Sequence, residues 1–124
     1  MSSWGYHLML NCAGCVPQKI RCPNNINQFA KQLVKDIDMV AYGEPQVVMF
    51  GSGNKKGYTL VQLIETSNIT AHFVEETNDV YLDVFSCKPF NKKSVDRVVT
   101  EFFGPRRQNF QYVVRQAPPV EQLK

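Results

Sequence analysis

Two segments of the chain carry apolar residues at the period of an α-helix. Pro23-Asn24-Asn25 opens the first segment, with an asparagine as the predicted N-cap. Its apolar residues stand at offsets 0, 3, 4, 7, 8 and 11, and they are Ile26, Phe29, Ala30, Leu33, Val34 and Ile37. The offsets place these side chains along one side of a helix, so the helix is predicted to lie on a sheet.

The second helical segment begins after Asn91, which is predicted to cap it. Phe90 and Val95 are spaced for a hydrophobic staple around this cap. The apolar stripe consists of Val95, Val98, Val99, Phe102 and Phe103. Gly104-Pro105 follows directly, which is the usual way for a helix to end.

The other apolar runs are short and rich in β-branched residues, which is typical of strands. They cover residues 6–12, 46–50, 58–64, 80–86 and 108–116, with one more strand between the turn at Ser67 and Val74. Turns at Gly43-Glu44-Pro45, Gly51–Gly57 and Thr77-Asn78-Asp79 separate several of them. The order β-α-β-β-β-β-α-β predicts an α+β fold, a two-layer sandwich of a largely antiparallel sheet with two helices on one face.

Strand 80–85 carries apolar side chains at both alternating sets of positions, with Leu82 and Val84 on one face and Tyr81 and Phe85 on the other. Two helices of one stripe each can cover only one face of the sheet. The second face is therefore expected to pack against another copy of the chain, which predicts a homodimer.

The length of 124 residues fits one domain, predicted over residues 1–116, with a loose tail over 117–124. A net charge of +3 and scattered Lys and Arg residues argue against nucleic acid as a partner. No apolar run is long enough to cross a membrane, and the first residues lack the pattern of a signal peptide. The cytoplasm is the expected location.

Cys12 and Cys15 have the C-x-x-C spacing that redox motifs and zinc half-sites share. A zinc site needs a second pair of ligands, and a redox motif needs a βαβ setting. Cys22 and Cys87 stand alone and complete neither arrangement. We expect free thiols and no bound metal.

The segment Glu65–His72 joins two strands and holds the residues on which a chemical function could depend. Ser67 lies at the turn, His72 is five residues later and Cys87 is twenty residues later. Considered one by one, these residues are typical of a hairpin turn, a strand and a small buried side chain. The G-x-S-x-G motif of serine hydrolases is absent, so periodicity alone indicates no function.

The segment Glu65–His72, followed by Tyr81–Cys87, resembles the signature of the small prokaryotic-type S-adenosylmethionine decarboxylases. Ser67, His72 and Cys87 keep the family's spacings, and Thr59, eight residues before Ser67, stands where the family has a second processing hydroxyl. The stretch from Tyr6-His7-Leu8 to Gly14-Cys15 is similar to the family's first strand, which gives the C-x-x-C a structural explanation.

The resemblance implies a proenzyme that cuts itself. Ser67 attacks the carbonyl of Thr66, His72 removes the Cα proton of Ser67, and cleavage leaves a light chain 1–66 and a heavy chain 67–124. The heavy chain then begins with a pyruvoyl group made from Ser67, which forms a Schiff base with the substrate amine and needs no metal or dissociable cofactor. Cys87 returns a proton to the product.

One geometrical condition applies to this mechanism. The offset of five between Ser67 and His72 is odd, so the two side chains face opposite ways along a regular strand. They can converge only if Ser67 lies in the turn or a bulge lies between them.

The chain departs from the family around the substrate. Asn68 replaces a histidine beside the serine, Val74 stands where bacterial relatives have a tryptophan, and Gly53 stands where they have an adenine-stacking phenylalanine, although Phe50 is close. Glu76 matches the acid that holds the ribose hydroxyls. The lost aromatic side chains weaken the case for a nucleoside.

Three functions therefore stay open. The first is decarboxylation of S-adenosylmethionine for spermidine synthesis, with Phe50, Glu65, Asn68 and Glu76 as candidate substrate-binding residues. The second is decarboxylation of arginine or ornithine, with Glu65, Glu75 and Glu76 as acids for a basic side chain. The third is an uncut, inactive relative that serves as a binding or regulatory subunit.

Overall fold

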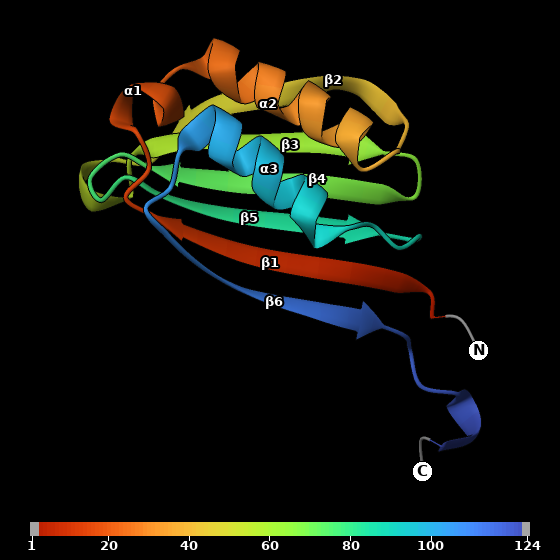
Figure 1. The fold of residues 1–124 in the computed structure, drawn as a ribbon. Helices are drawn as coiled ribbons and strands as arrows, with labels where there is room; N and C mark the ends of the chain where they lie inside the picture. Colours follow the sequence, from red (N-terminus) through yellow and green to blue (C-terminus); the bar gives the residue numbers. More distant parts are fainter. Residues whose placement is uncertain (1–2, 123–124) are drawn as a thin grey trace.

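Residues 3–122 are described in the computed structural model, and they form one six-stranded sheet with helices on a single face (Figure 1). In chain order, the elements are β1 (Gly5–Ala13), α1 (Pro17–Ile20), α2 (Pro23–Asp36), β2 (Ala41–Phe50), β3 (Gly57–Ile64), β4 (Ser67–Val74), β5 (Asp79–Ser86), α3 (Lys92–Phe103) and β6 (Arg107–Arg115). The strand order in the sheet is β2-β3-β4-β5-β1-β6, and each neighbouring pair is antiparallel. The predicted α+β sandwich is confirmed.

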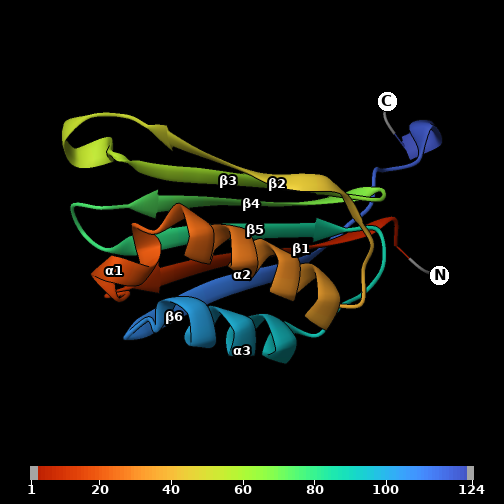
Figure 2. The same cartoon turned by 90° about the horizontal axis from the view of Figure 1, so that it is seen from above.

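Helices α2 and α3 lie side by side on the sheet (Figure 2), and both predicted stripes face the core. The predicted N-terminus of α2 was wrong in detail: Cys22 is the N-cap and Pro23 occupies the first turn. Proline suits that position because its missing N–H has no helical partner there. The Asn25 amide instead donates to Lys19 O at 3.0 Å and to Phe102 O at 2.9 Å, which ties α2 to its neighbours.

The α3 prediction holds at both ends. Asn91 Oδ1 accepts a hydrogen bond from the backbone N–H of Lys93 at 2.8 Å, as an N-cap does. Gly104 ends the helix with φ +54, in the left-handed region that favours glycine. The short helix α1 has no apolar repeat and was not predicted.

Strand β2 begins earlier than predicted, because Gly43-Glu44-Pro45 lies within it instead of turning the chain. The register shifts between Tyr42 and Gln46, so this segment is a bulge. Pro45 cannot donate to a ladder, and a bulge in an edge strand tolerates that loss. The next connection, predicted as a flexible loop, contains a 3-10 turn over Gly53–Lys55.

The core fills the space between the helices and one face of the sheet. Phe29, Phe73 and Phe103 meet there, with ring centroids 4.6 and 5.1 Å apart for the two pairs that involve Phe103. The other face of the sheet carries no helix among the described residues (Figure 1). We call it the open face; its large exposed apolar side chains include Val48, Phe50, Leu63, Tyr81 and Val113.

Within residues 3–122, the helices are too short or too polar to cross a membrane. The tail predicted as loose contains a short 3-10 helix over Val120–Gln122, and its last two residues lie outside the described part.

Candidate active site

The hairpin between β3 and β4 has a turn of two residues. Ile64 pairs with Ser67, so the turn consists of Glu65 and Thr66 alone. Thr66 has φ +58, a left-handed conformation that is a genuine outlier for a β-branched residue. The peptide bond between Thr66 and Ser67 therefore follows a residue with a strained backbone conformation.

Cys87 lies against this turn from the end of β5. Its backbone N–H donates to Ser67 Oγ at 3.1 Å, and its Sγ lies 2.7 Å from Thr66 Oγ1. The Thr66 hydroxyl donates its one hydrogen to Glu65 O at 2.6 Å, so the Cys87 thiol is the donor toward Thr66. Thr66, Ser67 and Cys87 form one cluster, which we call the turn cluster.

Ser86 fixes the position of Cys87. The Ser86 side chain is fully buried, donates to Lys88 O at 2.7 Å and accepts from Lys88 N at 3.1 Å. These two hydrogen bonds bend the chain directly after β5. The bend directs Cys87 toward the hairpin rather than along the strand.

His72 and Thr59 form a second cluster on the open face. They are cross-strand partners in β4 and β3, and Thr59 Oγ1 lies 3.2 Å from His72 Nδ1. A pocket of about 610 Å³ includes both side chains together with Phe50 and Tyr81. The structure thus brings together three of the predicted site residues, Thr59, His72 and Phe50, and we call this group the histidine cluster.

The two clusters do not meet within one chain. The pairing of β4 with β3 and β5 is unbroken from Asn68 to His72, so no bulge turns His72 toward Ser67. The two residues point to opposite faces of β4, and five residues of strand separate them by roughly 16 Å. His72 cannot reach the Cα proton of Ser67 in its own chain.

The remaining candidate residues are also divided between the ends of β4. Glu65 is exposed in the β3–β4 turn, and Glu76 is exposed in the β4–β5 turn at the far end. Asn68 is half-buried on the open face, between Leu63 and Phe85. The two carboxylates therefore do not line one acidic pocket in a single chain.

The open face carries a chain of polar contacts that no sequence pattern indicated. His7 Nε2 lies 3.0 Å from Asp83 Oδ1, and Arg115 Nη1 lies 3.2 Å from His7 Nδ1. Because arginine can only donate, His7 Nδ1 accepts and Nε2 carries the hydrogen that goes to Asp83. These residues come from three strands, so only the register of the sheet could have indicated the contact.

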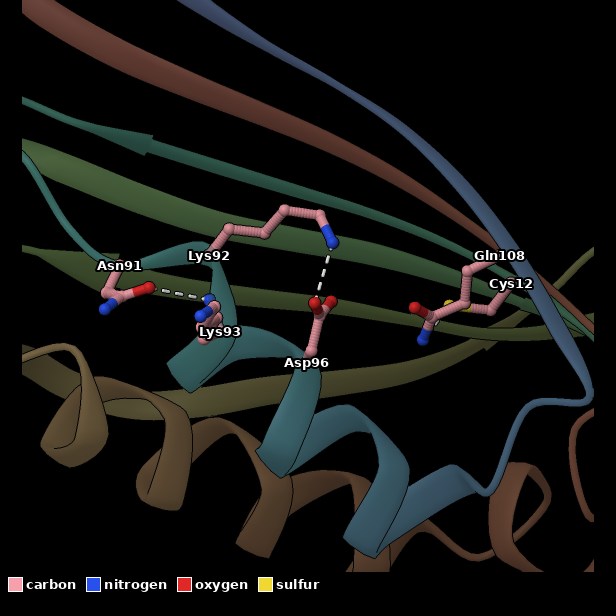
Figure 3. Close-up of polar contacts among 6 residues, drawn as sticks. All are labelled: Cys12, Asn91, Lys92, Lys93, Asp96 and Gln108. Atoms are coloured by element: carbon pink, nitrogen blue, oxygen red, sulfur yellow. Dashed lines mark hydrogen bonds and ion pairs between the residues drawn. The ribbon is translucent and has the colours of Figure 1, made fainter.

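The C-x-x-C pair is part of the core. Cys12 and Cys15 are both 2% exposed, and burial raises the pKa of Cys12 to about 12 and that of Cys15 to about 11. Gln108 Nε2 lies 3.9 Å from Cys12 Sγ, and the ion pair of Lys92 and Asp96 is nearby (Figure 3). Because neither thiol ionises at neutral pH, neither can act as a thiolate nucleophile or redox centre there. Within residues 3–122, no three His, Cys, Asp or Glu side chains gather as metal ligands do.

Comparison with a solved structure supports the fold. The crystal structure of the adenosylmethionine decarboxylase from Aquifex aeolicus superposes with a TM-score of 0.80, and each chain is covered to 98%. The sequence identity is 22%, so the likeness concerns the fold.

Sequence comparison extends this likeness to the family. The S-adenosylmethionine decarboxylase proenzyme of Pyrococcus furiosus is 30% identical over 104 residues, which are 82% of this chain and 72% of the relative. The proenzyme of Pyrococcus abyssi is 27% identical over the same shares of the two chains. The family model described as S-adenosylmethionine decarboxylase matches residues 6–116, which include both clusters. The chain therefore belongs to the S-adenosylmethionine decarboxylase family.

Proposed function

We propose that the chain is a proenzyme that cleaves itself between Thr66 and Ser67 and becomes a pyruvoyl-dependent decarboxylase. The observation that carries this proposal is the turn cluster, where a strained Thr66 precedes a serine hydroxyl that Cys87 holds in place. A peptide bond in a regular strand has neither the strain nor the neighbouring thiol.

Cleavage begins at the Ser67 hydroxyl. Its oxygen bonds to the carbonyl carbon of Thr66, the C–N bond breaks, and an ester with a free amine replaces the peptide. A base then removes the Ser67 Cα proton, the Thr66 carboxylate leaves, and hydrolysis of the resulting imine releases ammonia and leaves a ketone. The left-handed Thr66 favours the first step because the ester relieves its backbone strain.

The pyruvoyl group supplies an electron sink for the loss of CO₂ from an amine-bearing substrate. Cys87 supports this chemistry as a proton donor, because its thiol already lies at the turn and donates to Thr66 Oγ1. After cleavage, Thr66 becomes a chain terminus and the thiol is free to protonate the product carbon.

The base requires a second copy of the chain. His72 is the predicted base, and its imidazole lies on the open face, well away from Ser67 of its own chain. Two open faces can pack about a two-fold axis that lies between the sheets and runs perpendicular to the strands. This arrangement places one end of each sheet over the opposite end of the other. The turn cluster of one chain then meets the histidine cluster of its partner, and the exposed apolar side chains become buried.

The substrate we propose is S-adenosylmethionine, whose decarboxylated form donates aminopropyl groups in spermidine synthesis. The family supports this choice. The test is release of labelled CO₂ from each of the three carboxyl-labelled amino acids. Release from S-adenosylmethionine alone is the expected result; release from arginine or ornithine overturns the substrate, and release from none favours the uncut regulatory subunit.

A further inference from the structure

We infer that Tyr112 of β6 is a positioning residue for Cys87, because its hydroxyl holds the loop that carries the thiol. The loop consists of residues 87–91, between β5 and α3, and we call it the cysteine loop. This inference rests on the proposed function and adds a residue that the proposed mechanism does not use. It concerns how the main chain and the thiol of Cys87 are kept against the hairpin.

The Tyr112 hydroxyl contacts both main-chain polar groups of Phe90, near the end of the cysteine loop. It donates to Phe90 O at 2.8 Å, and the backbone N–H of Phe90 donates to it at 3.4 Å. A phenolic hydroxyl has one hydrogen and also accepts, so it can make both bonds. Phe90 is only 9% exposed, and a buried main-chain group without a partner is costly. One side chain of β6 therefore satisfies the polar groups of this part of the loop.

Aromatic side chains of β6 hold the same region in a second way. The rings of Phe90 and Tyr112 pack with their centroids 5.2 Å apart. Lys92, the first residue of α3, places Nζ 4.0 Å from the ring centroid of Phe110 and 2.7 Å from Asp96 Oδ2 (Figure 3). Phe110 and Tyr112 are two residues apart, so they share one face of β6. These contacts join the end of the cysteine loop and the first turn of α3 to the edge of the sheet.

The cysteine loop has little freedom between Cys87 and Phe90. Ser86 Oγ bonds to Lys88 O at 2.7 Å and to Lys88 N at 3.1 Å. Pro89 joins Lys88 to Phe90, and its ring fixes the φ angle at that position. The loop is thus held at Lys88 by Ser86 and at Phe90 from β6. Release of Phe90 leaves only the contacts at Ser86, and Cys87 lies directly beside them.

A movement of Cys87 changes two contacts at the hairpin. The backbone N–H of Cys87 donates to Ser67 Oγ at 3.1 Å, and its Sγ lies 2.7 Å from Thr66 Oγ1. The first contact depends on the main chain and the second on the side chain, so a shift of the whole residue weakens both. Tyr112 is therefore expected to affect self-cleavage and decarboxylation together.

Tyr112 acts on the Cys87 of its own chain. It pairs with Leu8 of β1, whose side chain is fully buried beneath the helices, so Tyr112 lies on the face of the sheet that carries the helices. The packing of two open faces does not involve this face. The contact with Phe90 is therefore independent of the proposed dimer, whereas the supply of His72 depends on it.

Amide hydrogen exchange, followed by NMR, tests the hold on the loop without using activity. The protein is the His72→Ala variant, which is expected to stay uncut, and the added change is Tyr112→Phe, which removes the hydroxyl and keeps the ring. The amides of Phe90 and Cys87 are expected to exchange about fivefold faster, whereas that of Val99 in α3 stays unchanged. Unchanged exchange at Cys87 overturns the inference. An equal rise at Val99 also overturns it, because the effect is then a general loss of stability.

Kinetics separate this inference from the proposed function. In the wild-type background, Tyr112→Phe is expected to slow self-cleavage and to lower kcat per cut chain for S-adenosylmethionine, each about fivefold, with KM nearly unchanged. Tyr6→Phe is the matched control, because Tyr6 pairs with Val114 on the same face and its loss of a hydroxyl leaves both bonds of Phe90 in place; exchange and both rates are expected to stay at wild-type values. An unchanged rate of either step in Tyr112→Phe overturns the inference but not the decarboxylase. Faster exchange at Cys87 in a protein whose wild type is not cut and releases no CO₂ overturns the decarboxylase but not the hold of Tyr112 on the loop.

Discussion

The backbone N–H of Cys87 donates to Ser67 Oγ at 3.1 Å, and this hydrogen bond joins the end of β5 to the start of β4. Because the donor is a main-chain group, the contact does not depend on the cysteine side chain. The thiol, which lies 2.7 Å from Thr66 Oγ1, has a separate partner. Self-cleavage and decarboxylation should therefore respond differently to changes at this position.

Cys87→Ala is predicted to leave self-cleavage in place and to slow decarboxylation. The main-chain hydrogen bond to Ser67 persists, whereas the proton donor is lost, and loss of general acid catalysis costs ~10²–10⁴-fold in kcat. Gel analysis of cleavage and labelled CO₂ release, measured on the same preparation, check both parts. Cys22→Ala, at a half-buried thiol far from the hairpin, is the control. Equal loss of cleavage and CO₂ release in Cys87→Ala would contradict the division of roles.

Mixed dimers test whether the base that acts on Ser67 is His72 of the partner chain. Ser67→Ala and His72→Ala are each predicted to stay uncut when produced alone. When the two variants are co-expressed, the His72→Ala chain should be cut, because it keeps Ser67 and its partner supplies His72. The Ser67→Ala chain should remain whole. A His72→Ala chain that is never cut in the mixture would mean that no partner histidine reaches the turn cluster.

Thr66→Gly is predicted to stabilise the uncut fold and slow its cleavage. Glycine adopts φ +58 without the ~1–2 kcal/mol that a residue with a Cβ loses there, so the free energy of unfolding should rise by about 1 kcal/mol. Urea unfolding in the Ser67→Ala background measures this rise, and the time course of cleavage in the wild-type background measures the rate. Asn78→Gly places glycine at another residue with φ +58, in the β4–β5 turn, where asparagine already tolerates that conformation; it should leave cleavage unchanged. Cleavage of Thr66→Gly at the native rate would show that strain plays no part.

The burial of the Cys12 thiol is expected to make the free energy of unfolding fall at alkaline pH. Burial raises the pKa of Cys12 from 9.0 to about 12, so above pH 9 the unfolded chain releases a proton that the folded chain keeps. The free energy of unfolding is then at its full value below pH 9 and falls as the pH rises toward 12. Urea unfolding at a series of pH values measures the slope, which Cys12→Ala should reduce and Cys22→Ala should not. An unchanged slope in Cys12→Ala would remove Cys12 as the cause.

The sequence predicted the elements that depend on local patterns. The apolar stripe of α3, its Asn91 cap and its terminal Gly104 lie close together in the chain, and all three are present in the structure. The N-cap of α2 was misassigned because Cys22 has no cap signal of its own, and the Asn25 amide is drawn to carbonyls of Lys19 and Phe102 instead. That competition depends on tertiary packing, which no local pattern contains.

The candidate site shows the same division. Turn residues around Ser67 predicted that it lies in the turn, but this was wrong: Ser67 is the first residue of β4, paired with Ile64, and the turn is Glu65 and Thr66. The left-handed conformation of Thr66 could not be predicted because its β-branched side chain disfavours it. The approach of Cys87, twenty residues away, depends on the register of β4 against β5 and on the bend at Ser86. The odd spacing of Ser67 and His72 indicated the conflict between them, and only the unbroken pairing of β4 shows that the strand does not resolve it.

Intact-mass spectrometry of the purified wild-type protein tests the central claim most directly. The account predicts two fragments, residues 1–66 and residues 67–124, with a ketone in place of the amine at the start of the second. Ser67→Ala should give a single intact chain under the same conditions. A wild-type chain that stays intact, or a second fragment that begins with a free serine amine, would contradict the account.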